Sequence, residues 1–181
     1  MPFTPFHLGP ALAFGLPLRR YLHVPTFIVG NVILDVEGLL VISLGLSYPV
    51  HGYLHTFLSA AIVGLLLGFV MFKLEAPMQP FYQKIRLESD KSLKLKSFVL
   101  AGIFGAALHV VFDAFLYSEM TPFFPLTTNP FLSAGLSMSQ VYNACVVLGI
   151  FGLVYYAAIL LYSTYNGRRK IKSIYFQSEK P

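Results

Sequence analysis

The chain has 181 residues, of which 56% are hydrophobic and only 12% are charged, and its mean hydropathy is +0.67. Soluble domains average about 25% charged residues, so this composition excludes a soluble globular protein. The net charge of +5 comes from short basic clusters beside apolar runs, a pattern typical of membrane topology signals and not of nucleic-acid binding.

Five apolar runs follow one another along the chain, at residues 6–18, 24–46, 54–72, 97–117 and 141–162. Because about 20 apolar residues cross a bilayer, the last four runs predict transmembrane helices. The first run is short, so it either spans with help from its neighbours or is re-entrant. We therefore expect an all-α integral membrane protein, with about five transmembrane helices in a small bundle and residues 1–166 as a single domain.

All 13 lysines and arginines lie in three places, namely Arg19 and Arg20, the stretch 73–96, and the chain from Arg168 onward. With five crossings, the three clusters fall on one side of the membrane. The positive-inside rule makes that side the cytoplasm, with the N-terminus outside the inner (plasma) membrane and the C-terminus inside. We expect 73–96 to be a solvated cytoplasmic loop, whether helical or not, and 167–181 to be a basic cytoplasmic tail.

Ionisable side chains within or beside the apolar runs are the most informative feature of the sequence. An unpaired ionisable group inside a membrane costs several kcal/mol, so such groups usually mark a functional site. The expected topology places seven of them at one depth in the outer half of the membrane: His7, Asp35, Glu37, His51, His55, His109 and Asp113. His23 lies beside the basic pair on the inner side, which excludes it from this set.

The spacing of these residues predicts metal binding. His51 and His55, and likewise His109 and Asp113, are four residues apart, which places each pair on one helical face, one turn apart. Two simpler interpretations remain open, in which the first pair caps a helix and the second pair interacts only with itself. We predict a metal site with six ligands, which are His7, Asp35, His51, His55, His109 and Asp113.

The two acids of the second run present a geometric problem. Asp35 and Glu37 would point about 200° apart on a regular helix, so both face one site only if the helix is broken there, or else one of them bonds elsewhere. Asn31 and Gly38 flank the pair and favour such a break. Glu37 is a candidate general base, and the alternative is that it orients a ligand histidine.

The chemistry of the ligands predicts the metal and the reaction. Imidazole and carboxylate without thiolate favour zinc, followed by manganese or iron, and Cys145 is the only cysteine. Six or seven donors are enough for one or two ions, and a two-metal site typically activates water for hydrolysis of a phosphoester or amide. Glu119 is a second candidate for general base or proton shuttle. It belongs to the segment 118–140, which is either a lid over the site or an ordinary outer loop.

The order of these motifs resembles that of the bacterial and archaeal family of inner-membrane metal-dependent hydrolases. The similarity covers about residues 4 to 130 and rests on Thr4-Pro5-Phe6-His7, Leu34-Asp35-Val36-Glu37, His51-x3-His55-Thr56 and His109-x3-Asp113. The family usually has Pro-Asp-x-Asp in the second motif, where this chain has Leu34 and Glu37, and it often has arginine at the position of Gly52. The resemblance implies a metal-dependent hydrolase.

A site in the outer half of the membrane is reached laterally by lipids. We therefore expect a hydrolase that acts on a lipid or isoprenoid phosphate, or on a related amphipathic substrate. Two alternatives remain open. The same ligands suit an ion-binding station in a metal or proton transporter, although five short helices without inverted repeats would be a small transporter. They also suit a structural membrane protein whose histidines and acids only pack the bundle.

Overall fold

The computed structural model describes residues 5–87 and 93–178, with side chains through residue 165. Thr4 of the first motif, residues 88–92 of the expected loop, and the tail side chains from residue 166 onward lie outside the described part. The described chain is all helical, with 74% helix and no strand, which confirms the predicted fold class.

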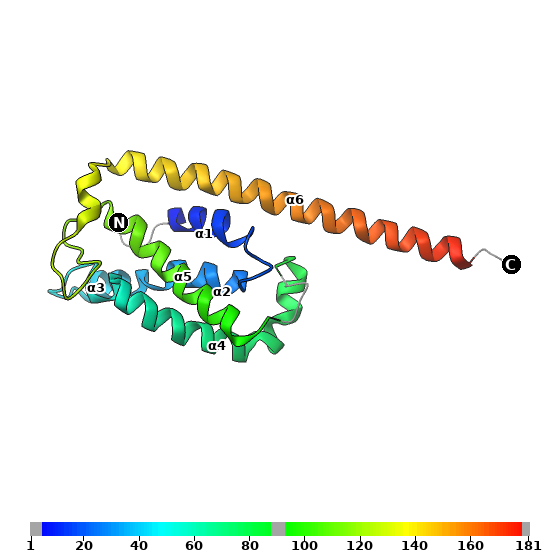
Figure 1. Ribbon diagram of the computed structural model, residues 1–181, viewed down its shortest axis with the longest axis horizontal. Coiled ribbons are helices and arrows are strands. Elements are labelled where there is room, and N and C mark those ends of the chain that lie inside the picture. The colour runs from blue at the N-terminus through cyan, green and yellow to red at the C-terminus, as the bar shows by residue number, and fades with distance from the viewer. Residues whose placement is uncertain (1–4, 88–92, 179–181) are drawn as a thin grey trace.

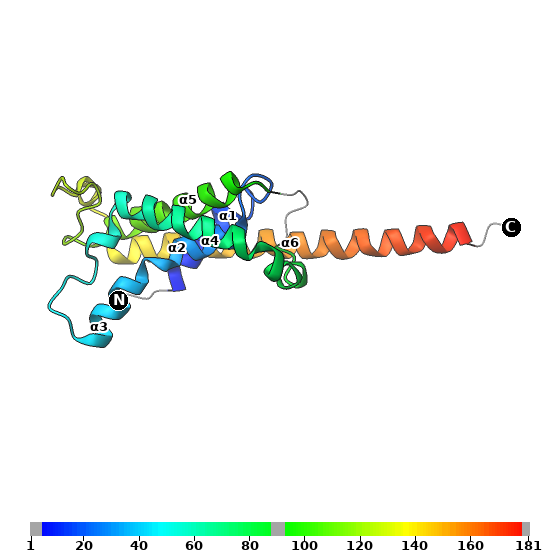
Figure 2. The ribbon, with the colours of Figure 1, turned by 90° about the horizontal axis from the view of Figure 1, so that it is seen from below.

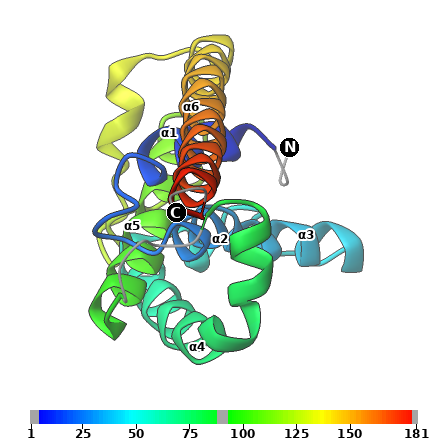
Figure 3. The ribbon, with the colours of Figure 1, turned by 90° about the vertical axis from the view of Figure 1, so that its right-hand side faces the viewer.

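The helices form three layers around α5 (Figures 1 and 3). Figure 3 looks along the bundle and shows α6 and α1 on one side, α2 and α5 in the middle, and α4 on the other side. In chain order the elements are η1 (Pro5–His7), α1 (Leu8–Gly15), α2 (Val24–Ile33), α3 (Asp35–Leu44), η2 (Tyr53–His55), α4 (Phe57–Lys84), α5 (Leu95–Ala114), η3 (Pro130–Ala134) and α6 (Met138–Ser178).

Four helical stretches are long and apolar enough to cross a membrane: Val24–Leu44, Phe57–Lys84, Leu95–Ala114 and Met138–Tyr165. Large apolar side chains on α3, α4 and α6 are exposed, as expected of surfaces that face lipid. The first apolar run forms only the eight-residue helix α1, which covers about 12 Å and is too short to span alone. The chain is thus a multi-pass membrane protein.

Helix α1 nevertheless runs along the bundle in parallel with α6. Gly9 packs against the backbone of Cys145, and Leu12 packs against Gly152 further along the same helix. His7 therefore lies at one end of the bundle, and Arg19 lies at the opposite end. We call these the histidine end, defined by His7, His51, His55 and His109, and the arginine end, defined by Arg19, Arg20 and Arg86.

Two helices continue past the limits of their apolar runs. Helix α4 extends to Lys84 instead of ending near residue 72, and it bends near Pro77 and Pro80, which each remove a backbone hydrogen bond (Figure 1). Helix α6 continues to Ser178, so the backbone of the expected tail is helical almost to its end. Much of the expected loop 73–96 is therefore the end of α4.

Small residues bring α5 close to both of its neighbours. A Cβ atom on Gly102 would overlap the carbonyl oxygen of Gly64 in α4, and one on Gly105 would overlap that of Phe27 in α2. Gly102 and Gly105 thus allow the three helices to pack closely. Because α2 and α4 both lie against α5, residues from all three helices meet at the histidine end.

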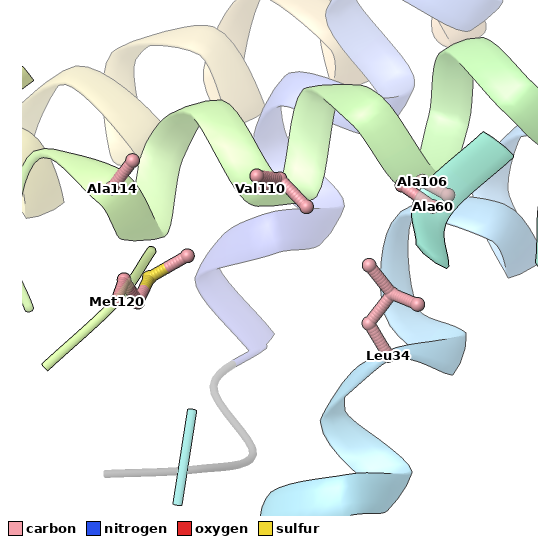
Figure 4. Packing of buried hydrophobic residues seen from close by; sticks show 6 residues of the cluster. All are labelled: Leu34, Ala60, Ala106, Val110, Ala114 and Met120. Atoms are coloured by element: carbon pink, nitrogen blue, oxygen red, sulfur yellow. The ribbon is translucent and has the colours of Figure 1, made fainter. Parts of the chain in front are cut away.

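An apolar cluster backs the histidine end (Figure 4). It consists of the fully or almost fully buried side chains Leu34, Ala60, Ala106, Val110, Ala114 and Met120. Three of these residues directly precede or follow Asp35, His109 or Asp113 in the chain. The cluster thus fixes the backbone that carries the candidate ligands and keeps water away from one side of them.

Candidate metal centre

Asp113 lies at the centre of the histidine end. It occupies the last turn of α5, one turn after His109, and both side chains are buried. The Nε2 atom of His109 lies 3.1 Å from Oδ2 of Asp113. The predicted shared helical face is therefore confirmed for this pair.

Three more histidines, from other segments, point at the same carboxylate. The Nε2 atom of His7 in η1 lies 3.1 Å from Oδ1 of Asp113. The Nε2 atoms of His55 and His51 lie 3.8 Å and 3.9 Å from Oδ2. All four side chains are buried, so Asp113 is enclosed by imidazole rings. The interpretation in which His109 and Asp113 interact only with each other is wrong.

The candidate ligands form two groups that share Asp113. The first group consists of His7, Asp35, His109 and Asp113, and the second consists of His51, His55 and Asp113. Within each group, one ligand atom from every residue lies within 4.8 Å of the others. A carboxylate shared by two sets of donors could contribute to metal binding in either group.

A break in the second apolar run brings both of its acids to this site. Helix α2 ends at Ile33 and α3 begins at Asp35, with Leu34 between them, and Figure 2 shows α3 turning away from the bundle. The Oδ1 atom of Asp35 lies 3.7 Å from Nε2 of His109, while Glu37 contacts His55. The predicted helix break is thus present immediately before Asp35.

The shared helical face predicted for His51 and His55 is wrong. His51 lies in a turn, His55 ends the short 3-10 helix η2, and α4 begins only at Phe57. Thr56 caps α4, because its hydroxyl accepts a hydrogen bond from the Ser59 backbone at 3.1 Å. The rings of His51 and His55 still meet, with centroids 5.0 Å apart, because the turn folds back over the end of α5.

In three of these histidines, the Nδ1 atom, which faces away from Asp113, makes a hydrogen bond. Nδ1 of His109 lies 2.9 Å from the backbone oxygen of Asn31, Nδ1 of His55 lies 2.8 Å from Glu37, and Nδ1 of His51 lies 3.0 Å from Glu119. An acceptor at Nδ1 holds the proton there and leaves the Nε2 lone pair free for a metal. The acceptors therefore orient the rings toward Asp113.

Glu37 also organises the loop before α4. Its carboxylate accepts hydrogen bonds from the Tyr48 hydroxyl at 3.1 Å and from the backbone N–H groups of Gly52 at 3.1 Å and Leu54 at 3.2 Å. A Cβ atom at position 52 would overlap the ring of Tyr48. Gly52, where the resembling family often has arginine, is thus required by the packing of Tyr48. Tyr48 was not among the predicted site residues, because its contact with Glu37 depends on the loop conformation.

His51 contacts two further side chains, Tyr117 and Glu119. The Tyr117 ring stacks on His51 with centroids 3.6 Å apart, and the Glu119 side chain is 42% exposed. Burial lowers the pKa of the His51 imidazole, which favours the neutral form that a metal requires. Burial opposes a low pKa at Glu119, but the hydrogen bond to His51 brings this pKa below its usual value. Glu119 is thus an ionised carboxylate within reach of water.

The donors fit a transition-metal ion. Four buried side-chain atoms of the site have no hydrogen-bond partner within the described part of the chain, namely His7 Nδ1, Asp35 Oδ2, His55 Nε2 and His109 Nε2. Unpaired buried polar atoms are costly, and cations beside Asp113 would satisfy the Nε2 atoms of His55 and His109 and the Asp35 carboxylate. Imidazole donors suit zinc, manganese or iron better than calcium or magnesium, which prefer oxygen. Buried histidines and aspartates at this end therefore form a candidate metal site.

A narrow cavity of about 10 Å³ reaches this site between η1, α5 and α6, and its lining includes His7, Asp113, Tyr117 and Tyr142. That volume holds about one water molecule. The start of the segment 118–140 is anchored rather than loose, because Met120 is 1% exposed and Pro122 accepts a 2.8 Å hydrogen bond from the Phe57 backbone.

His23, which the sequence excluded, lies away from the metal site. Its ring stacks on Phe98 near the other end of α5, and its Nε2 atom lies 3.0 Å from Glu75. Burial lowers the pKa of His23 to about 4, so this imidazole is neutral. The exclusion of His23 is confirmed.

Comparisons with protein-family models, with curated proteins and with solved structures each gave no match.

Proposed function

We propose that this chain is a membrane-embedded, metal-dependent hydrolase that acts on an amphipathic phosphate ester such as a lipid or isoprenoid phosphate. The observation that carries this proposal is the position of Asp113 between two groups of donors. When bound, one or two zinc ions would polarise the phosphoryl group and activate water, and manganese or iron fits the same donors. The resemblance of the motifs to inner-membrane metal-dependent hydrolases supports the same reaction class.

The residues of the chain divide into three roles under this proposal. His7, Asp35, His51, His55, His109 and Asp113 hold the metal, as the sequence predicts. Glu37 and the Asn31 carbonyl orient two of the ligand rings. Glu119 has one oxygen on His51 and a half-exposed side chain, so it is suited to carry a proton between the site and water. The predicted base role of Glu37 stays a prediction, and its four hydrogen bonds favour the orienting role instead.

The position of the site supports an amphipathic substrate. It lies where α4 begins and α5 ends, at the edge of two membrane-spanning helices. Exposed apolar side chains of α3 and α6, such as Leu40 and Val147, flank this end of the bundle. Acyl or prenyl chains can lie along these surfaces while the polar group reaches the site. The resemblance supports the inner (plasma) membrane, and the basic clusters support an orientation with the histidine end and the N-terminus outside and the C-terminus in the cytoplasm.

Transport is the rival function, and the interior of the bundle argues against it. Between His109 and Phe98, where His23 stacks, α5 continues for about 16 Å with the small residues Ala101, Gly102, Gly105 and Ala106 facing its neighbours. In the described part of the chain no ionisable side chain bridges this interval. An ion or proton that left the site toward the arginine end would therefore meet no further ionisable binding group among the described residues.

The test is elemental analysis of protein purified in detergent, followed by hydrolysis assays on prenyl phosphates and phosphatidic acid. We expect stoichiometric metal in the wild type, strong loss in Asp113→Asn, and no loss in His23→Gln, which removes a buried histidine outside the site. Chelator should abolish hydrolysis, and the metal should restore it. Protein that binds no stoichiometric metal would refute the proposal. Metal-loaded protein that moves zinc into liposomes without hydrolysing any ester would favour transport.

A further inference from the structure

A basic pocket of about 750 Å³ lies at the arginine end. It is formed by the α1–α2 connection, the turn after α4 and residues 155–163 of α6. Figure 1 shows these segments together, with the connection in blue, the end of α4 in green and α6 in orange. Arg19, Arg20 and Arg86 line it, and no acidic residue lines it among the residues described. Guanidinium groups from two distant segments thus converge on one hollow, which is typical of phosphate recognition.

Arg86 occupies a backbone position that usually belongs to glycine. Its φ is 54°, and it ends α4 with two hydrogen bonds, from its own N–H to Gln83 O at 3.1 Å and from Leu87 N–H to Tyr82 O at 3.0 Å. Helix α3 ends in the same way, but with Gly45 at φ 60°. Arginine in this left-handed conformation costs about 1 kcal/mol relative to glycine. The strain coincides with a side chain that lines the pocket, which indicates a functional role for that side chain.

The pocket lies at the depth of the second membrane interface. Its α6 residues begin at Tyr155, about 25 Å along the helix from Met138 at the histidine end. Exposed apolar side chains continue along α6 to Leu161, after which polar residues follow. A hydrocarbon core of about 30 Å therefore ends near the pocket, where lipid phosphate groups lie.

The walls of the pocket combine charge with apolar surface. Ala158 and Ile159 of α6 lie beside the arginines, together with the aromatic rings of Tyr155 and Tyr162. Tyrosine is typical of membrane interfaces, where its ring packs against lipid and its hydroxyl meets polar groups. A fully soluble anion would leave this apolar wall unused. We propose that the pocket binds the phosphate headgroup of an anionic phospholipid, at the membrane face opposite the metal centre.

Native mass spectrometry of the full chain in detergent tests this proposal. Phosphatidylglycerol and phosphatidylcholine with the same acyl chains are titrated separately, and inorganic phosphate is added as a competitor. We expect phosphatidylglycerol to bind about tenfold more tightly than phosphatidylcholine, because both carry the phosphate but the choline cation would lie against the three guanidinium groups. Inorganic phosphate that binds in place of phosphatidylglycerol would assign the pocket to a soluble anion and overturn the proposal.

The left-handed backbone of Arg86 allows its side chain to be removed by substitution with glycine, which adopts the same conformation. Arg86→Gly should weaken phosphatidylglycerol binding about tenfold while keeping the turn after α4, because glycine adopts the same left-handed conformation without strain. Arg20→Gln removes an exposed guanidinium of the same pocket and should also weaken binding. The matched control is Lys84→Gln, which removes a nearby charge that does not line the pocket. Equal weakening in the control would show general charge attraction and overturn the proposal. Metal content should stay unchanged in all three variants.

Discussion

Replacing Glu37 by glutamine separates an orienting role from a catalytic one. The carboxylate accepts two hydrogen bonds at each oxygen, from Tyr48 and Leu54 at Oε1 and from Gly52 and His55 at Oε2. An amide has one oxygen, so either orientation turns an NH₂ group toward two donors. With the NH₂ group at Oε1, the Leu54 N–H loses its acceptor. With the NH₂ group at Oε2, Gly52 loses its acceptor and His55 is driven to carry its proton on Nε2, where it cannot bind a metal.

The expected size of the effect follows from these contacts. Glu37 itself is buried, and at least one part-buried donor loses its partner in Glu37→Gln, at a cost of about 1–2 kcal/mol in unfolding free energy. Loss of the carboxylate behind a ligand histidine typically lowers metal affinity about 10- to 100-fold. Hydrolysis should fall in parallel at limiting metal and recover in part at saturating metal.

Chelator competition measures the metal affinity, and thermal unfolding with and without metal measures the stability. Tyr48→Phe is the milder control, because it removes one donor to Glu37 and an exposed acceptor of the Tyr53 N–H and leaves the hydrogen bond to His55 intact. It should cost about 0.5–1.5 kcal/mol in stability and change metal affinity less. If Glu37→Gln binds metal normally but no longer hydrolyses ester, the orienting argument is wrong and Glu37 is the general base.

Three further predictions concern the rest of the site. Asp113→Asn should abolish both metal positions, whereas Asp35→Asn and His51→Gln should each remove one, and elemental analysis that finds equal losses in all three would contradict a bridging role. Glu119→Gln should keep its metal, because an amide oxygen still accepts from His51, while hydrolysis falls about 10²- to 10⁴-fold; loss of metal would instead make Glu119 an orienting residue. Gly105→Ala forces a Cβ atom into the α2 backbone and should destabilise the protein by about 1–3 kcal/mol, and an unchanged unfolding temperature would refute the packing argument.

Sequence patterns predicted the parts of the site that lie on regular helix. His109 and Asp113 are four residues apart within a long apolar helix, so their common face follows from helical geometry alone. A break near Asp35 was also predicted, because two acids at a spacing of two cannot share a helical face. The structure places the break at Leu34, before both acids, and Glu37 bonds to His55 instead of joining the ligand groups.

The remaining parts depend on contacts between distant segments. His51 and His55 have helical spacing but lie in a turn and a 3-10 helix, because the loop is held by Glu37 from another element. The Asn31 carbonyl acts through its backbone, so its side-chain identity carries no signal. Such partners become visible only when α2, α4 and α5 are packed together.

The charge of the histidine end argues for two ions rather than one. Asp35, Glu37 and Asp113 are buried carboxylates that contact its histidines, while residues 21–72 and 97–167 contain no lysine or arginine. Their charge is therefore balanced by protons or by bound cations. With a single divalent ion, one negative charge would remain, and a proton that balanced it would occupy an imidazole or a carboxylate of the site. A second divalent ion balances that charge while the ligand imidazoles stay neutral, and Glu119, which reaches water, carries its charge without a bound cation.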